Sequence, residues 1–112
     1  MSGVQLTRAM VLEAPQRVAD GAGGFVLTWA ALGTLWAEVL PGSGREAAGT
    51  EVLVAAVPYR ITVRGAPVGS TARPKPEQRL RDGTRIFSIL AVSERDPEGR
   101  HLICFAREEV PA

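Results

Sequence analysis

The sequence predicts an all-β chain, a small β-barrel or sandwich of about six short strands with one short helix and long loops. Three observations support this prediction. Short runs rich in β-branched and aromatic residues recur along the chain, Gly and Pro separate these runs, and a single stretch carries a helix-start pattern. The length of 112 residues fits one domain, spanning residues 1–112, with a modest core.

The first predicted feature is a hairpin with a long connection. Residues 5–13 read as a strand that Pro15 ends. Residues 14–24 contain Asp20 and three glycines, which favour a turn or a loop over a regular element. Residues 25–30 follow as the second strand, and we expect it to pair with the first.

A third strand is predicted at residues 35–40, where Trp36 beside a carboxylate indicates a partly exposed face. The short helix follows, within a larger excursion over residues 41–55. Ser43 and Glu46 indicate its start, because they match the capping-box pattern. In a capping box the Ser side chain accepts a hydrogen bond from the backbone amide three residues on, and the Glu side chain accepts one from the backbone amide of the Ser.

The fourth strand is predicted at residues 59–64, where apolar and polar side chains alternate. Pro58 removes a backbone donor and places the beginning of this strand at an edge or a strand start. Residues 65–78 contain three prolines and little apolar material. We expect them to form a loop on the surface. A loop of this length without regular structure is uncommon, and such loops are often functional or disordered.

The last two strands form the predicted hairpin around which the fold is organised. Asp82 and Gly83 are a strong turn signal before the strand at residues 86–92. Both faces of that strand are apolar, so we expect it to be covered on both sides. A charged loop at residues 93–100 leads to the last strand, residues 101–107.

Four of the aromatic residues and the single cysteine are assigned to the core. They are Phe25, Trp29, Phe87, Phe105 and Cys104. A lone cysteine excludes an internal disulfide and a multi-cysteine metal site, and it fits a reducing compartment.

The charge of the chain is unevenly distributed. Seven basic and two acidic residues between Arg60 and Arg85 give +5, which leaves −4 for the rest of a chain whose net charge is +1. One interpretation is a basic region that faces an acidic partner, and the other is a solvated loop that maintains solubility.

The sequence offers little that a catalyst needs. The single histidine, His101, has no convincing nucleophile or second base with which to form a catalytic set, and we predict no catalytic residue, no metal site and no cofactor. No stretch approaches the ~20 apolar residues needed to cross a bilayer. We therefore expect no enzyme and no membrane partner.

Taken in order, the motifs resemble the phage head–tail joining family, the head-closure or stopper proteins of tailed-phage connectors. They are GGFVLTW at residues 23–29, LWAEV at 35–39, SGRE at 43–46, YRITVR at 59–64 and DGTRIFSI at 82–89. The resemblance covers nearly the whole chain.

This resemblance implies a β-barrel subunit of a homo-oligomeric ring, typically a hexamer, at the neck of a virion or of a phage-like gene transfer agent assembled in the bacterial cytoplasm. The implied partners are the portal-adaptor protein, a tail terminator or tail tube protein, and double-stranded DNA that passes through the channel without sequence specificity. The excursion over residues 41–55 matches the family's channel-closing loop, so we expect Ser43, Arg45 and Glu46 near the lumen or a subunit contact. Alternatively, Ser43 and Glu46 only cap a helix, and Arg45 alone has a partner.

Arg73, Lys75, Arg79 and Arg81 are the residues that we expect to contact partners, through acidic surfaces of the adaptor or tail rings. Two alternatives stay open at this point. One is a monomeric small β-barrel that binds nucleic acid through the basic region, and the other is a neighbouring connector component such as a tail terminator.

Overall fold

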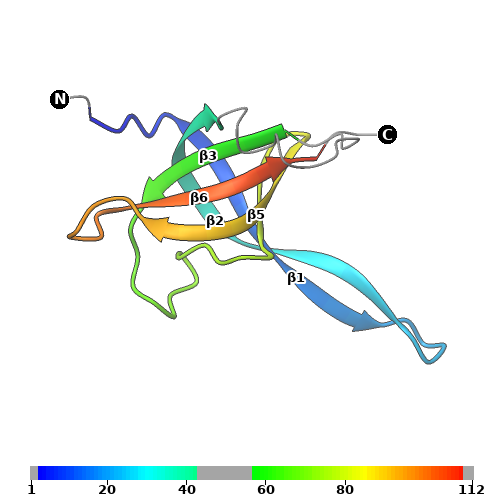
Figure 1. Cartoon of the computed structure of the whole chain (residues 1–112). Coiled ribbons are helices and arrows are strands. Elements are labelled where there is room, and N and C mark those ends of the chain that lie inside the picture. The colour runs from blue at the N-terminus through cyan, green and yellow to red at the C-terminus, as the bar shows by residue number, and fades with distance from the viewer. Residues whose placement is uncertain (1–2, 43–56, 110–112) are drawn as a thin grey trace.

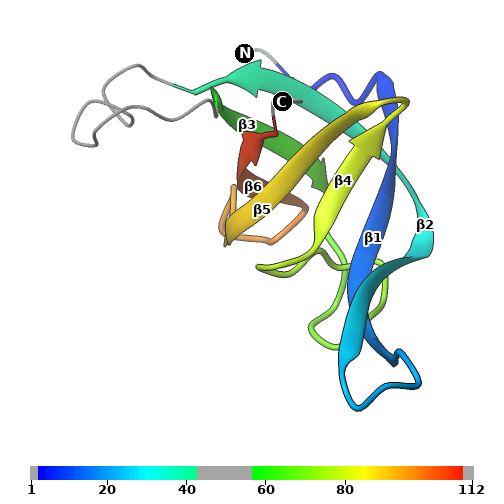
Figure 2. The same cartoon turned by 90° about the vertical axis from the view of Figure 1, so that its right-hand side faces the viewer.

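The described part of the chain is an antiparallel closed barrel. The structure, a computed structural model, describes residues 3–42 and 57–109. Within these residues there are six strands and no helix, and the strands close in the order β1-β2-β3-β6-β5-β4 (Figures 1 and 2). This confirms the predicted mainly β class, whereas the short helix predicted to begin at Ser43 lies outside the described residues.

The longest of the six strands is β2, with 17 residues, and the shortest is β4, with four. The strands are β1 (Arg8–Ala19), β2 (Phe25–Pro41), β3 (Val57–Arg64), β4 (Arg79–Asp82), β5 (Arg85–Glu94) and β6 (His101–Glu108).

The core fills the barrel with inward-pointing side chains from all six strands. Strand side chains alternate between the two faces, so every second residue reaches the interior. The buried apolar residues are Met10, Leu12, Ala37, Ile61, Val63, Leu80, Phe87, Ile89, Leu102, Cys104 and Ala106. The predicted core positions of Phe87 and Cys104 are therefore confirmed.

The first hairpin is longer and its connection tighter than predicted. β1 does not end at Pro15 but continues to Ala19, and it pairs with β2 along its whole length. Pro15 is tolerated because β4 pairs with β1 only from Val11 to Glu13, which leaves β1 beyond that point with a free edge. A missing backbone donor costs little at such an edge.

Residues 25–30 and 35–40, predicted as two strands, belong to the single strand β2. The strand bends where Gly33 has a φ of 147° and where the register shifts between Leu12 and Glu13. Such an irregularity turns a strand without ending it. One strand thereby serves both the barrel and the hairpin that extends from it.

The sequence prediction missed β4, a short strand that closes the barrel between β1 and β5. Its four residues have a single buried apolar side chain, Leu80. The turn after it is as predicted: Asp82 pairs with Arg85, and Gly83 takes a positive φ of 64° in the two-residue loop.

The predicted coverage of both faces of β5 is wrong. Leu90 is 53% exposed, and it lies at a register shift between Ile89 and Ala91. A bulge of this kind inserts an extra residue that has no cross-strand partner. The hairpin of β5 and β6 with a charged loop is confirmed.

The loop at residues 65–78 is fastened at both ends. The amide of Gly65 donates to the carbonyl of Arg100 at 2.7 Å, and the amide of Ile89 donates to the carbonyl of Gln78 at 2.9 Å. Pro74 and Gln78 are buried. This segment is a surface connection, as predicted, but it is anchored to the β5–β6 hairpin.

Candidate functional site

The outer part of the first hairpin groups four exposed large apolar side chains, those of Val18, Phe25, Val26 and Leu27. We call residues 14–31 the hairpin arm: the outer half of β1, the turn at residues 20–24 and the first half of β2. It projects from the barrel as a two-stranded ribbon (Figures 1 and 2). Phe25 is 65% exposed and Leu27 58% exposed, so the predicted core position of Phe25 is wrong.

Both faces of the hairpin arm carry apolar side chains. Directly paired residues point to the same face of an antiparallel ribbon. Val18 therefore shares one face with Val26, while Phe25 and Leu27 share the other with Arg17. The Arg17 guanidinium carbon lies 5.7 Å from the centre of the Phe25 ring. A two-stranded hairpin alone is marginally stable in water, so this ribbon is suited to being covered by another surface.

The tip of the hairpin arm is held by Asp20. Its Oδ1 accepts hydrogen bonds from the amides of Ala22 at 2.8 Å and Gly24 at 3.1 Å. These bonds lower the pKa of Asp20 below its usual value, because they stabilise the charged form. Gly21 and Gly23 adopt positive φ, which glycine does without strain. The tip is thus a defined turn with one negative charge.

The hairpin arm leaves the barrel beside an ion cluster, the Glu13 clamp, in which the buried carboxylate of Glu13 is paired with Arg79 and Arg81. Glu13 Oε1 accepts from Arg79 Nε at 2.6 Å, and Oε2 accepts from Arg81 Nε at 2.9 Å. The Glu13 side chain is only 7% exposed. Burial by itself raises the pKa of Glu13, but the two guanidinium groups outweigh it, and the pKa is lowered.

Trp29 joins the Glu13 clamp to the hairpin arm. The guanidinium carbon of Arg79 lies 4.0 Å from the centre of the Trp29 ring, a cation–π contact. Trp29 pairs with Pro15 in the ribbon, two residues beyond Glu13. One arginine on β4 therefore contacts β1 at Glu13, just before the arm begins, and β2 at Trp29, within the arm.

A second ion cluster braces the opposite part of the barrel. Arg85 donates from Nε and Nη2 to the two carboxylate oxygens of Glu108, at 2.8 and 3.0 Å. Its guanidinium carbon lies 5.0 Å from the centre of the Phe87 ring. The hydrogen bonds raise the pKa of Arg85 and lower that of Glu108. This bidentate pair ties the start of β5 to the end of β6.

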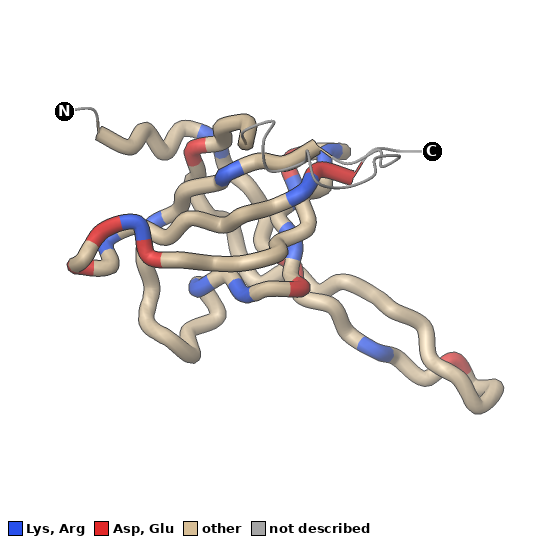
Figure 3. Tube along the Cα trace, in the orientation of Figure 1, with Lys and Arg blue, Asp and Glu red and all other residues tan. Residues whose placement is uncertain are grey.

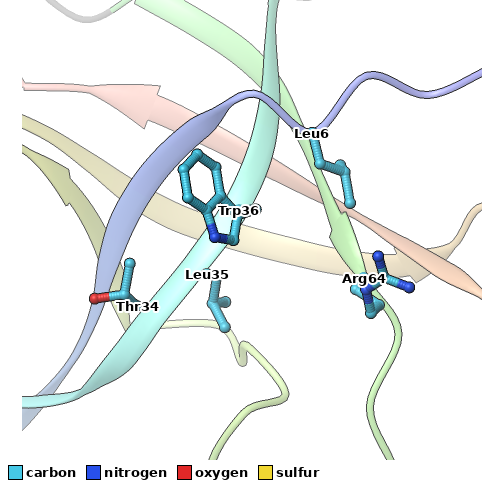
Figure 4. A pocket seen from close by; sticks show the side chains of 5 residues that line it. All are labelled: Leu6, Thr34, Leu35, Trp36 and Arg64. Atoms are coloured by element: carbon cyan, nitrogen blue, oxygen red, sulfur yellow. The ribbon is translucent and has the colours of Figure 1, made fainter.

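A pocket of about 290 Å³ lies on the free edge of β2, away from the tip of the arm. We call it the edge pocket, and it is lined by Leu6, Thr34, Leu35, Trp36 and Arg64. Figure 4 shows that these side chains come from the segment before β1, from β2 and from the end of β3. β2 pairs with β3 only from Ala37 onward, so the edge is unpaired here. Trp36 is 57% exposed, as predicted for this face.

The structure separates the residues that the sequence singled out. Ser43, Arg45 and Glu46 lie outside the described residues. Lys75 lies exposed in the 65–78 loop, where Arg73 donates from Nη1 to the carbonyl of Ala66 at 2.9 Å. Arg79 and Arg81 are not in that loop but on β4, in the Glu13 clamp.

The sequence prediction did not identify the hairpin arm, the Glu13 clamp or the edge pocket. A signal for the arm exists, because Val18, Val26 and Leu27 flank a Gly-rich turn with few charges around it. In the sequence, such residues look the same as core residues. The clamp joins residues more than sixty positions apart, and no local pattern marks it.

Two other kinds of site are absent from the part of the chain that the structure describes. Residues 3–42 and 57–109 contain no group of His, Cys, Asp and Glu side chains placed to hold a metal ion. Nor do they contain a helix that is long and apolar enough to cross a membrane. Cys104 is buried, and burial raises the pKa of its thiol to about 12.

Comparisons with known proteins relate this arrangement to phage particles. The family model described as phage head completion protein matches residues 1–109. A chain of the virion of a native gene transfer agent (GTA) particle is similar with 62% identity and a TM-score of 0.79, over 96% of this chain and 98% of that one. Protein SF1141 from Shigella flexneri 2a shares the fold, with 24% identity and a TM-score of 0.71 over the whole of both chains. None of the curated proteins compared matches the chain.

Proposed function

We propose, because this chain belongs to the phage head completion protein family, that it is a structural head-closure subunit of a phage or a phage-like gene transfer agent. In this role it forms a homo-oligomeric ring at the neck, typically a hexamer, between the portal-adaptor protein and the tail. The ring retains packaged double-stranded DNA and offers a docking surface to a tail terminator or tail tube protein. The similarity to a chain of a gene transfer agent virion supports this proposal.

The observation that carries the proposal is the hairpin arm. An enzyme needs converging reactive groups, whereas a ring subunit needs surfaces that reach its neighbours. The arm exposes Phe25, Val26 and Leu27 well away from the barrel, and its base contacts the Glu13 clamp through Trp29. Exposed apolar surface on a rigid support is characteristic of a surface that becomes buried in an assembly.

The remaining contacts follow from the same role. Lys75 and Arg73, in the anchored 65–78 loop, are proposed to face acidic surfaces of the adaptor or tail rings. Arg79 and Arg81 act from β4, mainly by holding the arm. Ser43, Arg45 and Glu46 are proposed to lie near the channel or a subunit contact. Contact with DNA in the channel is weak and independent of sequence, because the DNA has to pass through it.

Electron microscopy of particles made with and without this gene product tests the proposal. We expect a ring of density at the neck when the product is present. In its absence we expect full heads that leak DNA and lack tails. Normal tailed, DNA-filled particles formed without the product would overturn the proposal.

A monomeric nucleic-acid-binding barrel is the alternative from a different class of protein. It needs free basic side chains, yet Arg79 and Arg81 are both bound to Glu13. Salt-sensitive DNA binding by the isolated monomer, lost on changing Arg73, Lys75, Arg79 and Arg81 to Ala, would favour it.

A further inference from the structure

We propose that the tip of the hairpin arm of one subunit docks in the edge pocket of a second copy, so that neighbouring subunits are joined head to tail. This inference rests on the proposed function, because it names the contact that builds the ring. It follows from the shape of the two surfaces, their apolar character, their charges and their positions on the molecule.

The two surfaces match in apolar character. The tip presents Phe25 and Leu27, which share one face of the ribbon and are the most exposed of its large apolar side chains. The edge pocket presents Leu6, Leu35 and the indole of Trp36 (Figure 4). Aromatic and aliphatic anchors that fill such pockets supply much of the binding energy of protein interfaces.

The charges of the two surfaces are also complementary. The hairpin arm is almost without charge (Figure 3), and its two charged residues are Arg17 and Asp20. Asp20 lies at the tip. Arg64 is the one charged residue that lines the edge pocket, and no described carboxylate forms an ion pair with it. A docked tip would place a carboxylate beside this guanidinium, and opposite charges across an interface fix its register.

The positions of the two surfaces make the contact intermolecular. The tip lies at one end of a molecule that is 56 Å long, and the segment before β1 and the end of β3 lie on the other side of the barrel (Figure 1). The arm of a chain cannot reach its own pocket. A contact between two different patches is heterologous, and repetition of it closes a ring when the rotation is right.

The free edge of β2 adds a second reason for a copy to bind there. Thr34, Leu35 and Trp36, which line the edge pocket, pair with β1 on one side and have no strand on the other among the described residues. Unpaired strand edges are templates for another chain. The tip of a neighbouring arm is itself a pair of extended strands, so it suits this edge in shape.

Disulfide cross-linking in particles tests the contact. The variant Phe25→Cys/Leu6→Cys places one thiol at the tip and one in the edge pocket of every subunit. Cys104, the only natural cysteine, is buried and adds no background. Mild oxidation of purified particles is expected to give a ladder of dimers, trimers and higher species on a non-reducing gel. Each single variant can give dimers at most.

A matched control places the second thiol elsewhere on the barrel. Phe25→Cys/Leu90→Cys keeps an exposed apolar position but lies outside the edge pocket. It is expected to give no ladder. An equal ladder from this control, or no ladder from Phe25→Cys/Leu6→Cys in particles that contain the subunit, would overturn the head-to-tail contact.

The proposed pairing of Asp20 with Arg64 can be tested in the same cross-linking assay. Arg64→Gln is expected to lower the cross-linked fraction of Phe25→Cys/Leu6→Cys by about twofold to fivefold, the range for an exposed ion pair. Arg60→Gln, which changes another exposed arginine of β3, is expected to leave it unchanged. Equal effects of the two substitutions would contradict the pairing with Asp20.

The result separates this inference from the proposed function. Neck density and the presence of the subunit in particles are recorded on the same samples. A ring without a ladder would leave the head-closure role intact and reject the arm-to-pocket contact. Absence of the subunit from particles of the natural chain would reject both.

Discussion

Single residues show how closely the loops of this protein are fitted to the barrel. Gly65 begins the 65–78 loop and passes directly against the β5–β6 loop. A Cβ atom at this position would lie 2.1 Å from the carbonyl oxygen of Gly99. The contact atom belongs to the backbone and cannot swing away. Glycine is therefore required at position 65 by a close approach and not by a turn.

We predict that Gly65→Ala lowers stability by about 1–3 kcal/mol, the usual cost of forcing extra atoms into a packed site. The measurement is thermal unfolding, in which each kcal/mol corresponds to about 4–8 °C for a domain of this size. Gly3→Ala is the control, because nothing lies within 4 Å of a Cβ atom built there. Equal melting temperatures for the two variants would contradict the argument.

Cys104 lies in the core of the barrel. Its side chain is fully buried and its thiol pKa is raised to about 12, so at pH 8 almost none of it is thiolate. We predict that a thiol reagent labels the folded protein slowly, at the rate at which the barrel opens, and labels the unfolded chain at once. Immediate stoichiometric labelling in native buffer would show that Cys104 is accessible.

At the scale of elements, the Glu13 clamp links β1, β4 and the hairpin arm. Two hydrogen bonds to arginines hold a carboxylate whose surroundings are largely dry. The cation–π contact of Arg79 with Trp29 extends this link to β2. The arm is therefore a rigid projection at its base, although the ribbon beyond has no other strand beside it.

We predict that Glu13→Gln lowers stability by about 1–3 kcal/mol, because two charge-assisted hydrogen bonds lose their ionised acceptor. Amide hydrogen exchange in residues 14–31 should also accelerate. Glu98→Gln, in the exposed loop after β5, is the control and should change neither the stability nor the hydrogen exchange of the arm. Unchanged exchange in the arm of Glu13→Gln would show that the clamp does not orient it.

The same clamp predicts a dependence on pH. The pKa of Glu13 is lower in the folded chain than its usual value of 4.5. Its contribution to stability is thus fully present above about pH 4.5 and is lost as the pH falls through the lowered folded pKa. The free energy of unfolding measured in urea should be higher for the natural chain than for Glu13→Gln at pH 7, and this difference should become smaller below pH 4.5. A difference in the free energy of unfolding that stays constant with pH would contradict this prediction.

At the scale of the whole molecule, the arm makes the protein elongated. Its dimensions are 56 × 35 × 24 Å, and its radius of gyration of 15.1 Å exceeds the ~13 Å expected for a compact chain of this length. The fully buried core residues lie before position 13 or after position 36. The barrel thus has its own core, and the arm extends from it.

We predict that the barrel folds without the arm. Replacing residues 16–28 by Asn-Gly, which joins the paired residues Pro15 and Trp29 through a two-residue turn, should leave a cooperative β-sheet protein. Its melting temperature should lie within a few degrees of that of the natural chain, while its incorporation into particles should be lost. Circular dichroism measures the first result and immunoblots of purified particles the second. An unfolded variant would show that the arm is part of the folding unit.

Local patterns in the sequence were sufficient to predict the fold class, the two hairpin turns near the C-terminus and the core positions of Phe87 and Cys104. These depend on local rules: side-chain alternation with a period of two, glycine in a two-residue turn, and burial of apolar residues. The family resemblance drawn from the order of the motifs also agrees with the family model that matches residues 1–109.

Which apolar runs are buried and which are exposed depends on the closure of the barrel and could not be predicted from local patterns. Phe25 and Phe87 occupy similar apolar stretches, yet one is 65% exposed and the other fully buried. The difference arises because β1 and β2 are longer than the barrel is tall, so their outer parts have no opposite wall to pack against. Likewise, Arg79 and Arg81 look like free charges in the sequence, yet both form ion pairs with Glu13, which lies sixty-six and sixty-eight positions away. Contacts this distant in sequence are set by how the sheet closes, and no local pattern specifies them.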